Sequence, residues 1–281
     1  SLDSADLFDN VCRIKGSISM HKFGRSQSVE RREDFRFLTG AGCYVDDTAP
    51  ENALHGFVFR SMYAHGTILN LDIALASAAE GVRIIVTAKS LAADGIAGKM
   101  VASLLTNQDG SKSPNTERLL LAKDKVRFVG EPVAMIFADS LIQARAAAEM
   151  IVFEVEDLPV HLDIKPGGEQ LHYNAPENIA FDWALGDATE IAAINANAAH
   201  VLSFEVSDNR IICNSMEPRG CWADLEEERL HLCVNGQGVW AQKSQLCKML
   251  NLPENEIRVT NPDVGGGFGM KAMTYPEYFI C

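Results

Sequence analysis

Two glycine-rich turns hold the residues of this sequence that are best suited to chemistry. The first, residues 235–238 (NGQG), lies between a predicted strand and the start of a predicted helix. Glycines on both sides of one amide side chain allow a ligand to approach the backbone, and a helix N-terminus offers free N–H groups. Gln237 can donate an uncharged hydrogen bond to an oxo or carbonyl oxygen. An ordinary turn with a solvated glutamine is the alternative.

The second turn, residues 265–269 (GGGFG), follows a predicted strand. Glycine costs about 0.5–1 kcal/mol per position in regular structure, so three in succession indicate special dihedral angles or close approach of a ligand. The turn matches neither GxxxxGK[ST] nor GxGxxG. It predicts a site for a buried, anionic ligand, with a structural turn that plugs Phe268 into the core as the alternative.

Other candidates are weaker. We interpret the acid and base in residues 216–219 (MEPR) as structural. The seven histidines show no HxH or HxxxH spacing and the seven cysteines no CxxC pair, so we expect no protein-ligated metal and no disulfide framework, but buried free thiols. The sequence also contains no GxSxG nucleophile motif.

Composition limits the class of protein. A chain of 281 residues suggests two domains, and 47% hydrophobic content is enough for a buried core. The 25 Lys and Arg against 38 Asp and Glu give a net charge of −13, which argues against nucleic-acid and anionic membrane partners. No apolar stretch approaches the ~20 residues of a membrane span, and no secretory signal is visible, so we expect a cytoplasmic chain.

The elements that must position these turns fall into two groups. Residues 1–34 form an irregular arm, and 35–47 are expected to form two short strands around a glycine turn. The remaining elements of the first domain, 35–165, are strands at 54–60, 82–87, 125–129, 132–138 and 151–156, and helices at 72–80 and 140–150. Their alternation indicates a mixed α/β domain.

A linker over 166–185 separates this domain from a second unit, 186–281. Its expected elements are a helix at 187–199, a strand at 200–213, a hairpin of 222–225 with 230–234, a helix at 239–250 and a strand at 257–260. So few elements cannot close a well-buried domain, and the second unit is therefore expected to be incomplete.

Five stretches in order carry a family resemblance: RREDFRFLTGAGCYVDD, HGTILNLDIALASAAEGVRIIVTAKSL, VRFVGEPVAMIFADSLIQARAAAEMIVFEVEDLPV, NRIICNSMEPRGCWAD and VNGQGVWAQKSQLCKMLNLPENEIRVTNPDVGGGFGMK. Over about residues 30–281 the chain resembles the large, molybdenum-binding subunit of the molybdenum hydroxylases, the xanthine dehydrogenase, aldehyde oxidase and carbon monoxide dehydrogenase family. The resemblance implies an α+β fold, with an α/β hammerhead domain followed by the start of a mixed α/β molybdopterin-binding domain.

The resemblance also implies a site. Gln237, followed by Gly238, matches the glutamine that hydrogen-bonds an oxo ligand of molybdenum. Gly267, Phe268 and Gly269 match the loop that packs against the metal's coordination sphere. The cofactor expected is molybdenum–molybdopterin, in its plain or cytosine dinucleotide form. An amide donor and bare backbone beside an oxo group bury no charge, which agrees with this assignment.

Enzymes of this family are oxidoreductases that hydroxylate a carbon next to nitrogen or a carbonyl, with water as the oxygen source. FAD and [2Fe-2S] motifs are absent here, so these cofactors are expected on a FAD subunit and an iron–sulfur subunit. The family's general-base glutamate matches no position in this chain. We therefore assign no catalytic residue, expect the isolated chain to be inactive, and expect the rest of the molybdenum subunit as a further partner.

The position after the loop lysine bears on the substrate. Purine-oxidising members have an acid there, whereas Ala272 follows Lys271 in this sequence. An aldehyde or N-heteroaromatic substrate is therefore preferred to xanthine. Three alternatives stay open: a piece of a carbon monoxide dehydrogenase large subunit, a non-catalytic assembly or binding protein that keeps the hammerhead fold, and an unrelated nucleotide-binding protein.

Overall fold

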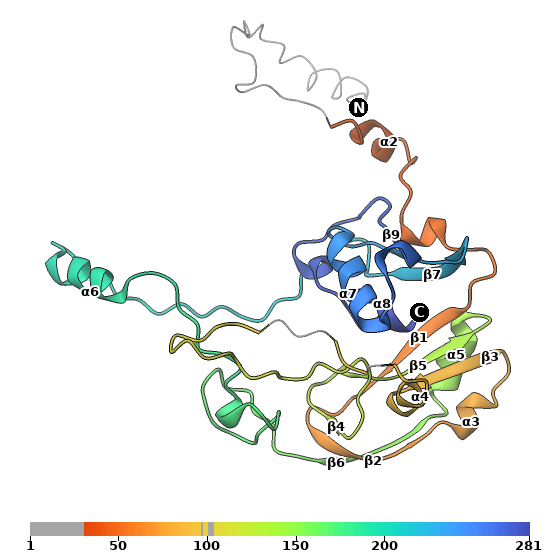
Figure 1. Ribbon diagram of the computed structural model, residues 1–281, viewed down its shortest axis with the longest axis horizontal. Helices are drawn as coiled ribbons and strands as arrows, with labels where there is room; N and C mark the ends of the chain where they lie inside the picture. The colour runs from red at the N-terminus through yellow and green to blue at the C-terminus, as the bar shows by residue number, and fades with distance from the viewer. Residues whose placement is uncertain (1–30, 97, 101–103) are drawn as a thin grey trace, which may run out of the picture. The chain divides into compact units, whose positions relative to one another are not determined.

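A computed structural model describes residues 31–96, 98–100 and 104–281 (Figure 1). The chain divides into two compact units, residues 1–42 and 43–281. In the first unit the described part contains one short helix, α2 (Asp34–Leu38). The irregular arm expected over 1–34 lies almost wholly outside the described residues, and α2 begins at its last position.

The two short strands expected over 35–47 are wrong. The chain there forms α2 and, in the second unit, the 3-10 helix η1 (Val45–Thr48). Polar side chains explain both turns. Asp34 accepts a hydrogen bond from the Arg31 side chain at 2.9 Å, and Asp47 accepts one from the Tyr44 backbone at 2.8 Å. Such local acceptors favour helical turns over extended pairing.

The first sheet of the second unit is antiparallel and has the order β1-β5-β3, with β1 (His55–Arg60), β5 (Pro132–Ala138) and β3 (Val82–Thr87). Helix α5 (Leu141–Ala148) packs on this sheet through Ala144 and Ala147, which are fully buried. Small alanine side chains allow the helix to approach the strands closely. The Ser140 hydroxyl caps this helix by accepting the Gln143 N–H at 3.3 Å.

A second antiparallel sheet has the order β4-β2-β6, with β4 (Lys125–Val126), β2 (Gly66–Asp72) and β6 (Val152–Asp157). Strand β2 lies outside the predicted elements. The helix expected over 72–80 is shorter, α3 (Ala74–Ser77), and Gly81 follows it with a φ of 78°. A further short helix, α4 (Ala88–Ala93), begins where β3 ends.

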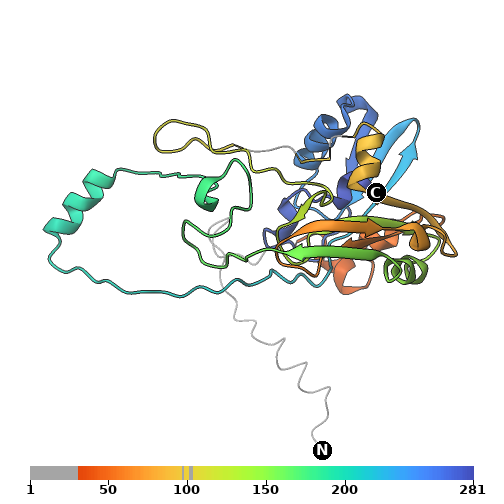
Figure 2. The ribbon, with the colours of Figure 1, turned by 90° about the horizontal axis from the view of Figure 1, so that it is seen from below.

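Residues 159–214 form a long connection that contains one short 3-10 helix, η2 (Pro176–Asn178), and one α-helix, α6 (Ala188–Asn197). Figures 1 and 2 both draw α6 within an open loop, and residues 181–214 are exposed throughout. The strand expected over 200–213 is wrong, because these residues are extended but pair with no described strand. A strand is stable only when a neighbour satisfies its backbone hydrogen bonds.

The third sheet has the order β7-β8-β9. Strands β7 (Cys221–Glu226) and β8 (Arg229–Val234) form the predicted hairpin, and its two turn residues, Glu227 and Glu228, have φ values of 50° and 65°. Strand β9 (Ile257–Thr260) pairs parallel to β8 after the crossover helix α7 (Trp240–Leu250) and the turn η3 (Glu254–Glu256). The carboxyl ends of β8 and β9 therefore meet at one edge of the sheet, and both glycine-rich turns follow these ends.

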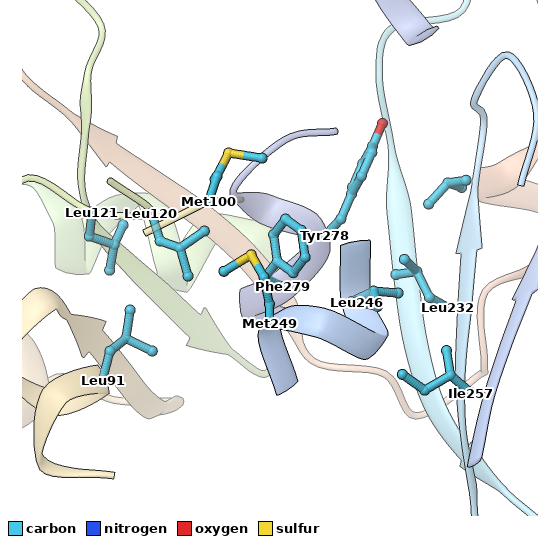
Figure 3. Packing of buried hydrophobic residues seen from close by; sticks show 11 residues of the cluster. Leu91, Met100, Leu120, Leu121, Leu232, Leu246, Met249, Ile257, Tyr278 and Phe279 are labelled. Carbon is cyan, nitrogen blue, oxygen red and sulfur yellow. The ribbon is translucent and has the colours of Figure 1, made fainter. Parts of the chain in front are cut away.

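One hydrophobic core is shared by both halves of the second unit (Figure 3). Leu91 of α4 and Leu120 and Leu121 of the first half belong to the same cluster as Leu232 and Leu246 of the second. The cluster also includes Phe279 of the last helix, α8 (Glu277–Ile280). The mixed helices and sheets confirm the predicted α+β fold.

Within the described residues, no helix combines the length and apolar character needed to cross a membrane. The described cysteines are all free, and only Cys233 among them is buried. Among the described cysteines, the expectation of buried thiols is therefore right for Cys233 alone, and Cys12 lies outside the described residues.

Candidate functional site

The first glycine-rich turn is anchored by Asn235, which follows β8 and is fully buried. Its side-chain oxygen accepts the Gly220 N–H at 3.0 Å, and its amide nitrogen donates to the Pro218 carbonyl at 2.6 Å. A second asparagine, Asn261, donates to the Gly236 carbonyl at 2.6 Å. These bonds attach the turn to the residues before β7 and after β9.

Gln237 lies at the centre of this turn and contacts the second one. Its backbone N–H donates to the Lys271 carbonyl at 3.0 Å, and its side-chain Oε1 accepts the Gly269 N–H at 2.8 Å. A backbone N–H can only donate, so this bond requires the amide oxygen to face the loop. The Nε2 group of this exposed residue makes no hydrogen bond within the described part of the chain and can donate to a ligand.

Loop 265–269 requires glycine at two positions because of their backbone angles. Gly266 and Gly269 have φ values of 99° and 86°, in the left-handed region that favours glycine. At Gly267 an added Cβ would lie 2.7 Å from Cδ of Gln237. Phe268 also has a positive φ, 52°, and is 73% exposed. The alternative in which Phe268 plugs the core is therefore wrong, because the backbone turns its ring away from the packed interior.

A buried ion pair lies behind the loop. Lys271 is fully buried, and its Nζ lies 2.9 Å from Oε2 of Glu217, which also accepts the Gly265 N–H at 2.8 Å. Burial raises the pKa of the Glu217 carboxyl, but hydrogen bonds from Lys271 and Gly265 outweigh it, and the net pKa lies below the ordinary value. The pair holds the loop against residues 217–220.

Sequence reasoning missed this pair. It interpreted the acid of residues 216–219 as structural and gave Lys271 no contact. The two residues lie 54 positions apart, and nothing in their local sequence signals the pairing. A lysine in a polar turn is ordinarily solvated, so only the path of the chain shows that this one is buried.

Arg219 has a different set of partners. Its guanidinium carbon lies 3.5 Å from the ring centroid of Tyr275, and its Nη1 lies 3.8 Å from Oε2 of Glu277. Glu277 is also paired with Arg60 of β1. This second group of contacts joins residues 217–220 to the segment after the loop.

The arrangement is suited to holding an oxygen-rich ligand through neutral donors. All the predicted site residues, Gln237, Gly238, Gly267, Phe268 and Gly269, belong to the two adjoining turns. In the described residues no group of three or more His, Cys, Asp or Glu side chains could hold a metal ion. A ligand here would therefore contact one amide group and bare backbone.

Two family models match the chain. Residues 39–159 match the a/b hammerhead domain of aldehyde oxidase and xanthine dehydrogenase, and residues 171–281 match the molybdopterin cofactor-binding domain. These ranges together cover most of the sequence.

Curated relatives agree. The chain is 36% identical to the nicotine 6-hydroxylase large subunit of Paenarthrobacter nicotinovorans, over 90% of this chain and 31% of the relative. It is 29% identical to the carbon monoxide dehydrogenase large chain of Hydrogenophaga pseudoflava, over 89% of this chain and 32% of the relative. The chain thus spans about a third of the length of these relatives.

Solved structures show the same fold. Quinoline 2-oxidoreductase from Pseudomonas putida 86 matches with a TM-score of 0.73 and 32% identity, over 90% of this chain and 32% of that one. The Cu,Mo-CO dehydrogenase matches with a TM-score of 0.75 and 27% identity, over 91% of this chain and 33% of that one.

Proposed function

Because the chain belongs to the aldehyde oxidase and xanthine dehydrogenase family of molybdenum hydroxylases, we propose that it supplies one wall of a molybdopterin site. The observation that carries this proposal is the fixed amide of Gln237. Its oxygen is held by Gly269, which leaves Nε2 to donate to an oxygen of the cofactor. Gly238, Gly267 and Phe268 complete the wall as backbone that the cofactor can approach closely.

The residues present fit such a group. Buried polar atoms near the loop have no hydrogen-bond partner in the described part of the chain, namely Ser215 Oγ, Glu217 Oε1 and Asn261 Oδ1. Buried polar groups are normally satisfied, so their presence supports a polar ligand at this edge of the sheet. When bound, the molybdenum cofactor would supply the hydroxylation chemistry, with water as the oxygen source. The role of Gln237 is to orient it by hydrogen bonding.

We extend the proposal to the domain limits. The hammerhead domain would span 35–165, the linker 166–185, and the N-terminal part of the first molybdopterin-binding domain 186–281. The matched hammerhead range, 39–159, lies within the first of these limits, whereas the matched cofactor-binding range begins at residue 171, inside the proposed linker.

An N-heteroaromatic compound is the preferred substrate class, with an aldehyde as the second choice. Relatives named for nicotine and quinoline support the first class. Ala272, which is exposed next to Lys271, places no acidic side chain there to bind a purine. Electrons would leave through [2Fe-2S] centres and FAD on partner subunits.

The 281-residue chain would not turn over by itself. It contains no residue that we assign as the general base, and its relatives are about three times as long. Assay of the isolated chain with nicotine, quinoline and an aromatic aldehyde should therefore detect no product. Turnover by the isolated chain would contradict this part of the proposal.

Molybdenum content tests the proposal directly. The complex is isolated from its native host through a tag on this subunit, and molybdenum per chain is measured by elemental analysis. We expect a ratio near one, a lower ratio for Gln237→Ala, and an unchanged ratio for Gln245→Ala in the neighbouring helix. Absence of molybdenum with flavin and iron–sulfur partners still attached would overturn the proposal and favour a non-catalytic assembly protein.

A further inference from the structure

Two segments of the chain, residues 217–221 and 271–281, contact each other at three points. Glu217 pairs with Lys271 at one end, and Arg219 contacts Tyr275 in the middle. At the other end Cys221, the first residue of β7, lies with its Sγ 3.7 Å from Sγ of Cys281, which follows α8. The last contact is between two thiols that are 60 residues apart in sequence.

Both thiols line a cavity of about 580 Å³. Its apolar wall comes from strands β1 and β5, including Phe57 and Phe137. Tyr278 also lines it, is buried, and has a hydroxyl with no hydrogen-bond partner within the described residues. A small polar molecule, such as a peroxide, can therefore enter this cavity and reach the sulfur atoms.

We propose that Cys221 and Cys281 form a reversible disulfide that converts the third contact into a covalent one. The oxidant is a peroxide. One thiolate attacks a peroxide oxygen, the O–O bond breaks, and a sulfenic acid and water form after protonation. The second thiolate attacks that sulfur and releases a second water, so two thiols and one hydrogen peroxide yield one disulfide and two waters.

The contact between the two thiols determines how the oxidation depends on pH. The hydrogen bond to Cys281, followed by burial, raises the pKa of the Cys221 thiol well above its ordinary value. Because the thiolate is the nucleophile, the raised pKa slows attack by Cys221 on peroxide at neutral pH, and this attack becomes faster as the pH rises. The inference rests on the distance between the two sulfur atoms and on the cavity that they line, and is independent of the cofactor proposal.

The disulfide would fasten the segment that carries Lys271 to the segment that carries Glu217. A cross-link between residues 60 positions apart constrains the unfolded chain over a long loop. Oxidation should therefore raise the melting temperature by roughly 5 °C or more. Dithiothreitol should reverse this change.

The test uses the full 281-residue chain in a Cys43→Ser/Cys213→Ser background, which removes two exposed thiols. The protein is treated with limited hydrogen peroxide, alkylated, digested without reductant and analysed by mass spectrometry. We expect a cross-linked peptide pair that contains Cys221 and Cys281, from a band of single-chain size on a non-reducing denaturing gel, together with a higher melting temperature. Cys221→Ser should abolish the cross-link and the temperature shift, whereas Cys247→Ser should leave both unchanged.

Two outcomes would overturn the inference. One is oxidation of Cys221 or Cys281 to sulfinic acid with no cross-link between them. The other is a melting-temperature shift that persists in the Cys221→Ser variant. Mapping of the unmutated thiols keeps the test valid even if a serine variant folds poorly.

Discussion

The Nζ atom of Lys271 lies 2.9 Å from Oε2 of Glu217, and the lysine has no exposed surface. A buried charge without a partner is strongly unfavourable, so the buried lysine depends on its partly exposed partner Glu217. Since Lys271 also accepts the Gln237 N–H through its carbonyl, the ion pair fixes the backbone that positions the amide group. The charges of this site thus lie behind its binding surface, and the exposed groups are neutral.

Removal of either residue of the ion pair should destabilise the folded chain. Lys271→Met leaves the Glu217 carboxylate poorly compensated, and we expect the free energy of unfolding to fall by about 3–5 kcal/mol in urea denaturation. Adding Glu217→Gln to that variant should recover a substantial part of the loss, because the amide no longer carries a buried charge. Simple additivity of the two single substitutions would show that the residues are not coupled.

The same pair predicts a pH dependence. The folded-state pKa of Glu217 lies below the ordinary value of 4.5, so its stabilising contribution is fully present above that pH. It is lost as the pH falls through the lowered folded-state pKa. The free energy of unfolding, measured from pH 7 to pH 3, should therefore decrease more for the wild type than for Glu217→Gln. Parallel profiles would contradict the assignment.

Gly267→Ala should separate stability from cofactor binding. The added Cβ meets the end of the exposed Gln237 side chain, which can move away, so unfolding free energy should change by less than about 1 kcal/mol. Displacement of the amide should nevertheless lower molybdenum per chain in the assembled complex. Gly98→Ala, where a Cβ meets no atom of the described residues within 4 Å, is the control. Wild-type molybdenum content in Gly267→Ala would count against the role of Gln237.

Gly265→Ala, two residues earlier, should destabilise the protein more than Gly267→Ala. Its Cβ would lie 2.5 Å from Cβ of Glu217 and 3.4 Å from the backbone nitrogen of that residue. No side-chain rotation can move Cβ or the backbone nitrogen of Glu217, so the loop backbone itself must move away from Glu217. We expect a loss of about 1–3 kcal/mol in the free energy of unfolding. Equal melting temperatures for Gly265→Ala and Gly267→Ala would refute this distinction.

The extended segment 200–213 predicts self-association of the isolated chain. Leu202 and Phe204 are 89% and 81% exposed, and they alternate with the polar residues Ser203 and Glu205. An extended apolar stretch with free backbone groups favours strand pairing between copies. In sedimentation velocity, Phe204→Lys should weaken the association, while Ser203→Lys on the opposite face should have less effect. An equal effect of both would exclude strand pairing through the apolar face.

Local patterns were sufficient for much of the fold. The hairpin of β7 and β8, helix α7 and strand β9 follow from hydrophobic periodicity and turn residues, and they lie close to their predicted ranges. The same approach failed at 35–47, where capping side chains favour helical turns. It also failed at 200–213, where the strand-like alternation is real but no described strand pairs with the segment.

The sequence by itself determined where the two turns lie, because glycine readily adopts the positive φ angles found at Gly238, Gly266 and Gly269. Only the tertiary structure decided how these residues meet. The bond from Gly269 to Gln237 spans 32 positions, and the ion pair of Lys271 with Glu217 spans 54. Contacts over such separations depend on the path of the whole chain, so no local pattern encodes that Lys271 is buried or that the Gln237 amide is held by the loop.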